Sequence, residues 1–269
     1  MAKTDIHCHV NWLDMDIDAW AKHFTDLGID RVFALGWEEW DRRWTGEYEL
    51  PTEDQIEASQ RYPDLFIPWC SVDPREKDVP GKIREYVKRG CKGFGECKIR
   101  LMVDNPDLKV VYRTCDELGL PILFHMDIWM PGVPHWYMMD LERLGPVLEE
   151  FPSVQFIGHG PGWWREMSGD ADDHMTTAYP EGPITPGGRL PEMLAKHDNL
   201  HADLSAGSGL RGITRDPEFG RQFLIDLSDK LMYGTDFHDR ALLDAIEGYN
   251  LPEDVYEKIM DGNSRKLIP

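Results

Sequence analysis

The sequence lacks several features that would place it outside the ordinary globular proteins. No apolar run approaches the ~20 residues that a membrane-spanning helix needs. The N-terminal segment has no basic stretch followed by an apolar one, so we expect no signal peptide. The five cysteines are odd in number and include no CxxC pair, which favours reduced thiols in a cytoplasmic protein over a disulfide framework or a cysteine-based zinc site.

Positive charge is also scarce, because 29 Lys and Arg residues face 49 Asp and Glu residues and leave a formal net charge of −20. Such a surface repels phosphate backbones and anionic lipids, so we expect neither nucleic acid nor a membrane as a partner. A small anionic substrate would need a local positive centre, such as a metal ion, to overcome this field. The ten Trp, ten Phe and nine Tyr residues exclude a disordered chain.

Short apolar runs alternate with helix-like segments along the chain, and no linker interrupts them. Gly28, Gly90 and Gly119 stand where helices would end, and Thr52 with Gln55 has the pattern of a capping box. The β-then-α repeats predict a single α/β domain over residues 1–269, a (β/α)8 TIM barrel. A doubly wound open sheet is the structural alternative, but it would lack a GxGxxG turn after its first strand. The expected strands cover residues 5–9, 31–36, 65–73, 91–99, 121–127, 154–160, 200–205 and 231–236.

Polar side chains recur at the carboxyl ends of these expected strands, where a barrel enzyme has its active site. His7 and His9 are separated by one residue, which places both imidazoles on one face of the strand and Cys8 on the other, toward the helices. A single strand-end histidine is more often a hydrogen-bonded core residue, but an ordered set of such groups is costly to bury without a cation. Imidazole and carboxylate are usual ligands of divalent ions, so we expect a metal site at this face. The other strand ends carry Asp73, Glu96, Lys98, His125, His159, Asp203, Ser205 and Asp236.

The segments that hold these residues resemble the amidohydrolase superfamily, and in particular the amidohydrolase 2 branch, which contains aminocarboxymuconate-semialdehyde decarboxylase. The resemblance rests on DIHCH, LFHMD, FIGHGPG, YGTD and IMDGNSRKLI, which follow one another over nearly the whole chain. It implies a metal-dependent enzyme with His7, His9, His125 and Asp236 as ligands. It also implies that His159 acts on water or substrate as an acid, a base or an electrostatic stabiliser, and that Asp236 accepts a proton from the nucleophilic water. A homodimer is a further expectation from the family.

The fourth strand departs from a simple version of this pattern, because it offers both Glu96 and Lys98 on one face. Glu96 could bridge a second metal ion. Both residues could instead contact the substrate, or they could form an internal ion pair. One or two ions per chain are therefore expected, with zinc as the first choice and manganese as the alternative.

Aromatic residues and arginines are concentrated in the loops that follow the strands. The aromatic residues predict a wall for a ring-containing or sugar-like ligand, although they could also pack the loops onto the barrel rim. Arg165, Arg211 or Arg215 could clamp a substrate carboxylate, unless loop acids pair with them. We expect Lys98, Trp163 and Arg211 to contact the substrate. The aromatic set comprises Trp37, Trp40, Trp44, Trp129, Trp136, Trp163 and Trp164.

These features favour a metal-dependent hydrolase that acts on a C–N or C–O bond of a small molecule, such as a lactone or an amide, through an activated water. The alternative is a metal-dependent non-oxidative decarboxylase, which would need an arginine clamp and no bridging ligand on the fourth strand. Glu96 favours hydrolysis. A third hypothesis is a binding protein whose barrel has lost its catalytic activity. The intact set of histidines and Asp236 disfavours it.

Overall fold

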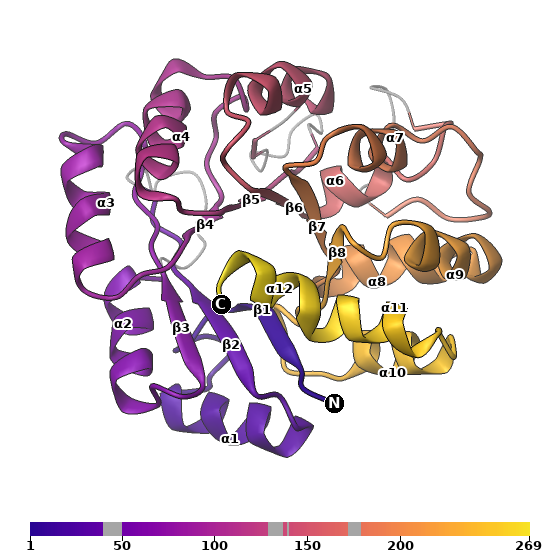
Figure 1. Cartoon of the computed structure of the whole chain (residues 1–269), viewed down its shortest axis with the longest axis horizontal. Coiled ribbons are helices and arrows are strands. Elements are labelled where there is room, and N and C mark those ends of the chain that lie inside the picture. The colour runs from indigo at the N-terminus through magenta and orange to yellow at the C-terminus, as the bar shows by residue number, and fades with distance from the viewer. Residues whose placement is uncertain (40–49, 129–136, 139, 172–178) are drawn as a thin grey trace.

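The computed structural model of the chain describes residues 1–39, 50–128, 137–138, 140–171 and 179–269. Within these residues the strands are all parallel and run in chain order around a barrel (Figure 1). Each overlaps one of the expected ranges. The strands are β1 (Thr4–Cys8), β2 (Arg31–Leu35), β3 (Phe66–Trp69), β4 (Phe94–Cys97), β5 (Ile122–His125), β6 (Phe156–His159), β7 (Leu200–Asp203) and β8 (Leu231–Met232).

Two sets of hydrogen-bonded strands, β1 to β3 and β4 to β8, are joined into one closed barrel. Between β3 and β4 the junction is a parallel bridge from Cys70 to Phe94. Between β8 and β1 the backbone N–H of Ile6 donates to the carbonyl of Tyr233 at 3.0 Å, and that of Asp236 donates to His7 at 2.8 Å. The predicted TIM barrel is confirmed, and its closure brings the carboxyl ends of β1 and β8 together.

Helices cover the outside of the barrel, and in the described part of the chain two of them follow each of β6 and β7 (Figure 1). Gly28 and Gly119 are left-handed C-caps, as expected, whereas α3 ends two residues before Gly90. The predicted capping box is wrong, because Pro51 is the N-cap and the Thr52 hydroxyl donates to the Ser71 carbonyl. The helices are α1 (Ile17–Leu27), α2 (Thr52–Arg61), α3 (Val79–Lys88), α4 (Pro106–Leu118), α5 (Leu141–Glu150), α6 (Pro161–Arg165), α7 (Arg189–Lys196), α8 (Ala206–Thr214), α9 (Pro217–Asp226), α10 (Ala241–Gly248), α11 (Glu253–Glu257), the π-helix η2 (Lys258–Gly262) and α12 (Asn263–Leu267).

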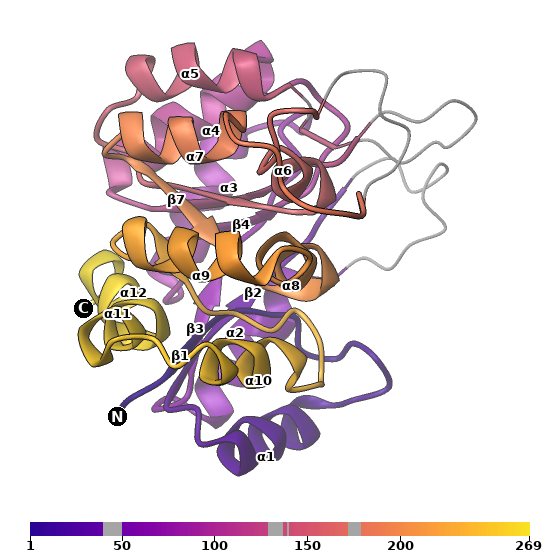
Figure 2. The same ribbon diagram turned by 90° about the vertical axis from the view of Figure 1, so that its right-hand side faces the viewer.

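Apolar side chains pack in two layers, one inside the barrel and one between the strands and the helices. The C-terminal segment closes the amino end of the barrel, because Ile268 joins the inner layer and its carbonyl accepts a hydrogen bond from Arg31 at 2.7 Å. Both chain ends lie on this side (Figure 2). None of the helices in the described ranges is long and apolar enough to cross a bilayer. The inner layer consists of Ile6, Phe33, Leu35, Trp69, Leu123, Ile157, Met232 and Ile268.

A β-bulge in β1 sets the direction of the first histidine. Asp5 pairs with Val32 and Cys8 pairs with Ala34, so Ile6 and His7 together stand opposite one residue of β2. Bulges of this kind re-aim side chains beside active sites. Cys8 joins the layer between strands and helices, as its spacing from the histidines predicts.

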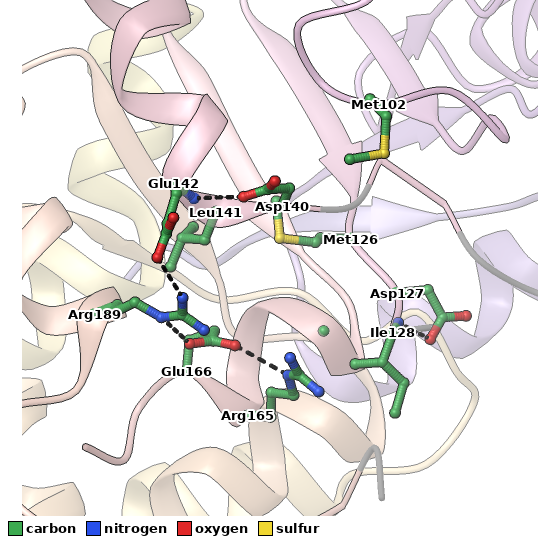
Figure 3. A pocket seen from close by; sticks show the side chains of 11 residues that line it. Met102, Met126, Asp127, Ile128, Asp140, Leu141, Glu142, Arg165, Glu166 and Arg189 are labelled. Carbon is green, nitrogen blue, oxygen red and sulfur yellow. Dashed lines mark hydrogen bonds and ion pairs between the residues drawn. The ribbon is translucent and has the colours of Figure 1, made fainter. Parts of the chain in front are cut away.

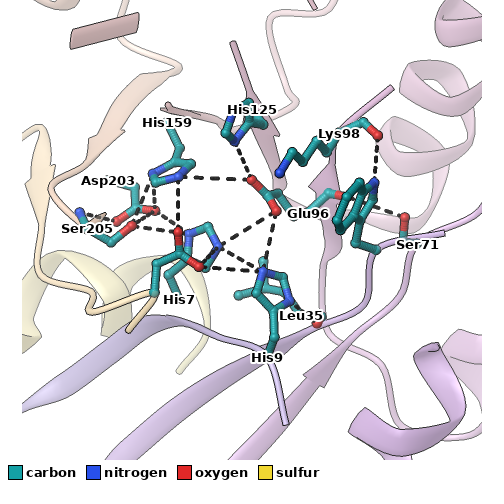
Figure 4. A network of polar contacts seen from close by, with 12 residues as sticks. His7, His9, Leu35, Ser71, Glu96, Lys98, His125, His159, Asp203 and Ser205 are labelled. Atoms are coloured by element: carbon teal, nitrogen blue, oxygen red, sulfur yellow. Dashed lines mark hydrogen bonds and ion pairs between the residues drawn. The ribbon is translucent and has the colours of Figure 1, made fainter. Parts of the chain in front are cut away.

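A second bulge in β4 sets the direction of Glu96. Phe94 pairs with Ile122 and Cys97 with Phe124, so Gly95 and Glu96 both face Leu123. Gly95 has φ +153°, and a Cβ there would stand 2.7 Å from the Leu123 carbonyl oxygen, so a larger residue would not fit. Figure 4 shows that His7 and Glu96, which these two bulges carry, turn their side chains toward the same space.

Candidate functional site

Three side chains from β1 and from the segments after β1 and β8 form the first donor cluster, namely His7, His9 and Asp236. The two Nε2 atoms of the histidines are 3.2 Å apart, and Asp236 Oδ1 lies 3.4 Å from Nε2 of His7 and 3.7 Å from Nε2 of His9. Glu96 Oε2 approaches the same point, at 3.4 Å from His9 Nε2 and 4.0 Å from His7 Nε2 (Figure 4). Four of the predicted ligands therefore converge.

Hydrogen bonds at the far side of each ring fix the tautomers of His7 and His9. His7 Nδ1 donates to Asp203 at 2.6 Å, and His9 Nδ1 donates to the carbonyl of Leu35 at 2.8 Å. A carboxylate and a carbonyl can only accept a hydrogen bond. Each neutral ring therefore carries its hydrogen on Nδ1 and has its lone pair at Nε2. Two lone pairs that face each other across 3.2 Å repel unless a cation stands between them.

The spacing of these donor atoms fits a divalent metal ion. Ligand bonds of about 2.0–2.2 Å in a tetrahedral site separate neighbouring donors by ~3.4 Å, and the measured separations lie around that value. The second polar atom of each member also has a partner, as in most metal ligands. His7 Nδ1 contacts Asp203, His9 Nδ1 contacts the Leu35 carbonyl, and Asp236 Oδ2 lies 3.6 Å from His159 Nε2. The residues present therefore fit a divalent cation.

A second donor cluster lies beside the first and consists of Glu96, His125 and His159, from β4, β5 and β6. Glu96 Oε1 is 2.7 Å from His125 Nδ1 and 4.0 Å from His159 Nε2. Because its other oxygen faces the first cluster, the Glu96 carboxylate is shared between the two. His159 Nε2 also lies 3.6 Å from Asp236 Oδ2, so the two clusters adjoin at both ends.

Buried negative charge dominates the electrostatics of this region. Burial opposes the ionisation of Glu96, but His125 and the ammonium group of Lys98 hold the pKa of its carboxyl well below its usual range. Burial likewise opposes a charge on Asp236, yet His7 and His159 keep the pKa of that carboxyl low. Carboxylates in a nearly dry site need a positive partner, and a metal ion supplies one.

His159 responds strongly to this field. Burial alone would lower the pKa of its imidazole, but the Asp203 and Asp236 carboxylates raise that pKa to about 10. The position therefore attracts positive charge, which a proton or a metal ion can provide.

Two buried aspartates were not assigned a role from the sequence. Asp203, at the end of β7, accepts the hydrogen bond from His7 and lies next to His159. Asp5, in β1, accepts backbone N–H bonds from His7 at 2.9 Å and from Thr235 at 3.1 Å, and burial raises the pKa of its carboxyl to about 7. The signal that could have found both is an acidic residue within an otherwise apolar strand.

Lys98 lies at the edge of the second cluster. Its ammonium stands 4.2 Å from the centre of the Trp37 ring and 5.4 Å from that of Tyr137, and the indole N–H of Trp37 donates to the Lys98 carbonyl. The Tyr137 ring in turn meets the His125 ring edge to face at 5.9 Å. Aromatic faces hold a cation in place without neutralising its charge, so Lys98 keeps a positive charge close to Glu96.

Among the described residues, the aromatic side chains that lie beside the first cluster are not predicted ones. Trp12 stacks edge to face on His9 at 5.5 Å and on Phe237 at 5.6 Å, and Phe237 is 39% exposed. Trp163 was expected to contact substrate, but it has no exposed surface and packs on Phe124 in the layer between strands and helices. That expectation is corrected: Trp163 is a core residue, because α6 folds back onto the barrel wall.

The remaining predicted aromatic residues fall into two groups. Trp164 is also buried, and its indole N–H donates to the backbone carbonyl of Asp203 at 3.1 Å. The other four lie outside the described residues, namely Trp40, Trp44, Trp129 and Trp136.

The arginines named from the sequence differ in their surroundings. Arg211 lies within α8, where it pairs with Glu181 at 3.3 Å and donates to the Pro180 carbonyl. Arg165 lines a cavity of about 250 Å³ that also includes Met126, the residue after His125 (Figure 3). In this cavity the buried Glu166 accepts hydrogen bonds from Arg165 at 3.0 Å and from Arg189 at 2.7 Å. Between Arg165 and Arg211, Arg165 is the better placed to meet a ligand near the site.

The sequence matches one protein family over residues 4–269, the Amidohydrolase family. A comparison with curated proteins finds no match.

Solved structures with the same fold include enzymes of two reaction types. A probable 2-pyrone-4,6-dicarboxylic acid hydrolase of Acinetobacter baumannii is 14% identical, with 99% of each chain covered and a TM-score of 0.64. A dihydroxybenzoic acid decarboxylase of Polaromonas, solved with manganese and 2-nitroresorcinol, is 16% identical over 99% of this chain and 96% of that one, with a TM-score of 0.65. An uncharacterised TIM-barrel protein of Bordetella bronchiseptica is 16% identical, covers 100% and 98%, and has a TM-score of 0.66.

Proposed function

This chain belongs to the Amidohydrolase family, and we propose that it is a metal-dependent hydrolase of a small molecule with a C–N or C–O bond, such as a lactone or an amide. The observation that carries the proposal is the position of Glu96. One of its oxygens faces His9 and the other faces His125, so a single carboxylate is shared between two sets of ligand atoms. This arrangement supports a two-metal site, which would suit the activation of water for hydrolysis.

The two donor clusters supply the ligands. His7, His9 and Asp236 would hold the first ion together with Glu96, and Glu96, His125 and His159 would hold the second. In this assignment His159 is a ligand, in place of the acid, base or stabilising role that the resemblance implies. Zinc suits nitrogen and carboxylate donors, and manganese, which the decarboxylase of Polaromonas contains, is the alternative.

A divalent ion bound here lowers the pKa of water and polarises a substrate oxygen. Asp236 is the residue of this chain that is placed to move the proton. Its Oδ1 faces the first cluster, and its Oδ2 remains on the side of His159, at 3.6 Å from Nε2. Asp236 can therefore serve as a ligand through one oxygen and accept a proton on the other.

The mouth of the site offers contacts for the rest of the substrate. Trp12 and Phe237 present aromatic surface beside His9, and Lys98 presents a positive charge beside Glu96. A planar ring with an anionic or carbonyl oxygen would meet both. The similar hydrolase of Acinetobacter baumannii is named for a pyrone, which is a cyclic ester of this kind.

A non-oxidative decarboxylase is the second candidate, and Arg100 favours it. Its side chain is 10% exposed, its guanidinium stands 5.1 Å from the centre of the Tyr137 ring and donates to the Tyr137 hydroxyl at 3.2 Å, and Tyr137 packs on His125. The same guanidinium pairs with Glu39 at 3.3 Å, so a substrate carboxylate near the second cluster would share Arg100 with Glu39.

A comparison of products tests the two candidates. Purified protein loaded with zinc or manganese is incubated with lactones, amides and hydroxylated aromatic acids, while cleavage of the ester or amide bond and release of carbon dioxide are followed separately. We expect metal-dependent turnover of a lactone or an amide without carbon dioxide, and no turnover by the protein carrying both His7→Ala and His9→Ala. Release of carbon dioxide from an aromatic acid, with every lactone and amide unchanged, would establish the decarboxylase instead.

A further inference from the structure

One buried carboxylate lies behind both donor clusters. Asp203, at the carboxyl end of β7, has no exposed surface, and its Oδ2 accepts hydrogen bonds from His7 Nδ1 at 2.6 Å and from the Ser205 hydroxyl at 2.8 Å. The same oxygen lies 3.2 Å from His159 Nδ1. His7 belongs to the first cluster and His159 to the second, so one oxygen contacts an imidazole of each (Figure 4).

The local structure leaves this carboxylate one orientation. Its second oxygen, Oδ1, accepts the backbone N–H of Ser205 at 2.9 Å, which fixes the rotation of the carboxyl group. Gly234 packs directly against the pair, because a Cβ at that position would stand 2.9 Å from Asp203 Oδ1 and 3.1 Å from His7 Cβ. His7, Ser205 and His159 are themselves buried, which shields the acceptor from bulk water.

Both imidazoles are thereby held in the same tautomer. His7 gives its Nδ1 hydrogen to Asp203, and His159 Nδ1 lies between Asp203 Oδ2 and Ser205 Oγ, which is 3.0 Å away. Because Ser205 donates its own hydrogen to Asp203, its oxygen is an acceptor for His159. Each ring therefore carries its hydrogen on Nδ1 and turns Nε2 toward the cluster it serves.

His7, His159 and Asp203 could also form a third metal site, since their nearest donor atoms lie within 4.8 Å of one another. Their contacts argue against it. A neutral imidazole has one lone pair, and that of His7 is at Nε2, which faces His9 and Asp236 in the first cluster. Its Nδ1 carries the hydrogen that Asp203 accepts and is therefore not a ligand atom.

We propose that Asp203 is a positioning residue that sets the tautomer of His7 and of His159 together, and so links the metal affinities of the two donor clusters through one oxygen atom. The inference rests on the proposed function for its metals, but whether Nδ1 of each ring carries a hydrogen can be measured without any metal. Replacing Asp203 with Asn is the informative change. An amide keeps the volume, but its NH2 group must face either His7 Nδ1 or the Ser205 N–H, and both are donors.

The matched control is Asp5→Asn. Asp5 is as buried as Asp203, lies two residues before His7 in sequence, and contacts the His7 backbone but not its ring. Its single accepting oxygen, Oδ1, is retained by an amide, so both tautomers should stay as they are. The second test variant is Ser205→Ala, which removes an acceptor 3.0 Å from His159 Nδ1 and a longer contact of 3.3 Å to His7 Nδ1. His7 keeps its acceptor Asp203 at 2.6 Å.

The experiment combines imidazole nitrogen NMR on the metal-free protein with metal titration against a chelating dye. In the wild type and in Asp5→Asn we expect His7 and His159 to carry hydrogen on Nδ1. In Asp203→Asn we expect both rings to lose that preference, and the affinities of both ions to fall by about 10–100-fold, the usual effect of removing such a partner. In Ser205→Ala we expect a larger change at His159 and the second ion than at His7 and the first, because His7 keeps its closer acceptor Asp203.

Each outcome separates this inference from the proposed function. Unchanged tautomers and affinities in Asp203→Asn would overturn the positioning role, even if the wild type binds two ions. Equal losses in Asp203→Asn and Asp5→Asn would also overturn it, because they would reflect general destabilisation. A wild type that binds no ion but shows the tautomer change in Asp203→Asn would keep the positioning role and remove the metal-dependent function.

Discussion

The change Glu96→Gln tests whether this carboxylate is shared between two metal ions. Glu96 is 3% exposed, with Oε1 at 2.7 Å from His125 Nδ1 and Oε2 at 3.4 Å from His9 Nε2. Glutamine has the same shape but carries no charge and offers one oxygen instead of two. A neutral amide is a poor bridging ligand, so we expect the fully loaded protein to fall from about two ions per chain to about one.

The effect on stability can be worked out from the same contacts. Without metal, the variant loses one charge-assisted hydrogen bond between Glu96 and His125, which corresponds to a decrease of about 1.5–3 kcal/mol in the free energy of unfolding. Elemental analysis after metal loading and desalting gives the ion count, and urea unfolding of the metal-free protein gives the stability.

Other roles for Glu96 leave different signatures. If its only function is to balance the ammonium of Lys98, the ion count stays at its wild-type value and stability falls further, by about 3–5 kcal/mol. If it contacts the substrate, the ion count and stability both hold while KM rises. Two ions per chain in Glu96→Gln would refute the bridging role.

Three further changes probe other parts of the structure. Combining His7→Ala with His9→Ala removes two of the first cluster's ligands, so elemental analysis should find that ion missing; full occupancy would show that the cluster is not a metal site. His159→Asn should keep the fold and the first ion but lose the second. If the variant instead keeps every ion and loses turnover, His159 acts as an acid or a base and is not a ligand. Burial lowers the pKa of His201 from 6.5 to about 4, so its contribution to stability is present above pH 6.5 and is lost as the pH falls toward 4. Unfolding measurements should therefore show about 2 kcal/mol more loss between about pH 7.5 and pH 5 for the wild type than for His201→Gln, and parallel pH profiles would contradict this.

The barrel and the direction of its polar strand ends could be predicted because both depend on local periodicity. Parallel strands that alternate with helices carry their chemistry at one end, and a two-residue spacing keeps His7 and His9 on one side. The 3.2 Å approach of their Nε2 atoms agrees with that expectation. The bulges that turn His7 and Glu96 toward each other depend on pairing with β2 and β5, which a single sequence does not reveal.

The errors concern residues whose environment is set by tertiary contacts. Trp163 was expected to contact substrate from a loop after the sixth strand, but α6 begins at Pro161, folds onto the barrel wall and buries this side chain. Trp12 and Phe237 flank the first cluster only because the closed barrel brings the segments after β1 and β8 together. The role of Asp203 likewise depends on contacts with strands that are distant in sequence.

The number of metal ions in the fully loaded wild-type protein tests the central claim most directly. Purified protein is incubated with excess zinc or manganese, desalted, and analysed for metal and protein in the same sample. The sharing of Glu96 between the two donor clusters predicts about two ions per chain. A ratio of one would contradict the two-metal site, and a ratio of zero would contradict metal dependence itself.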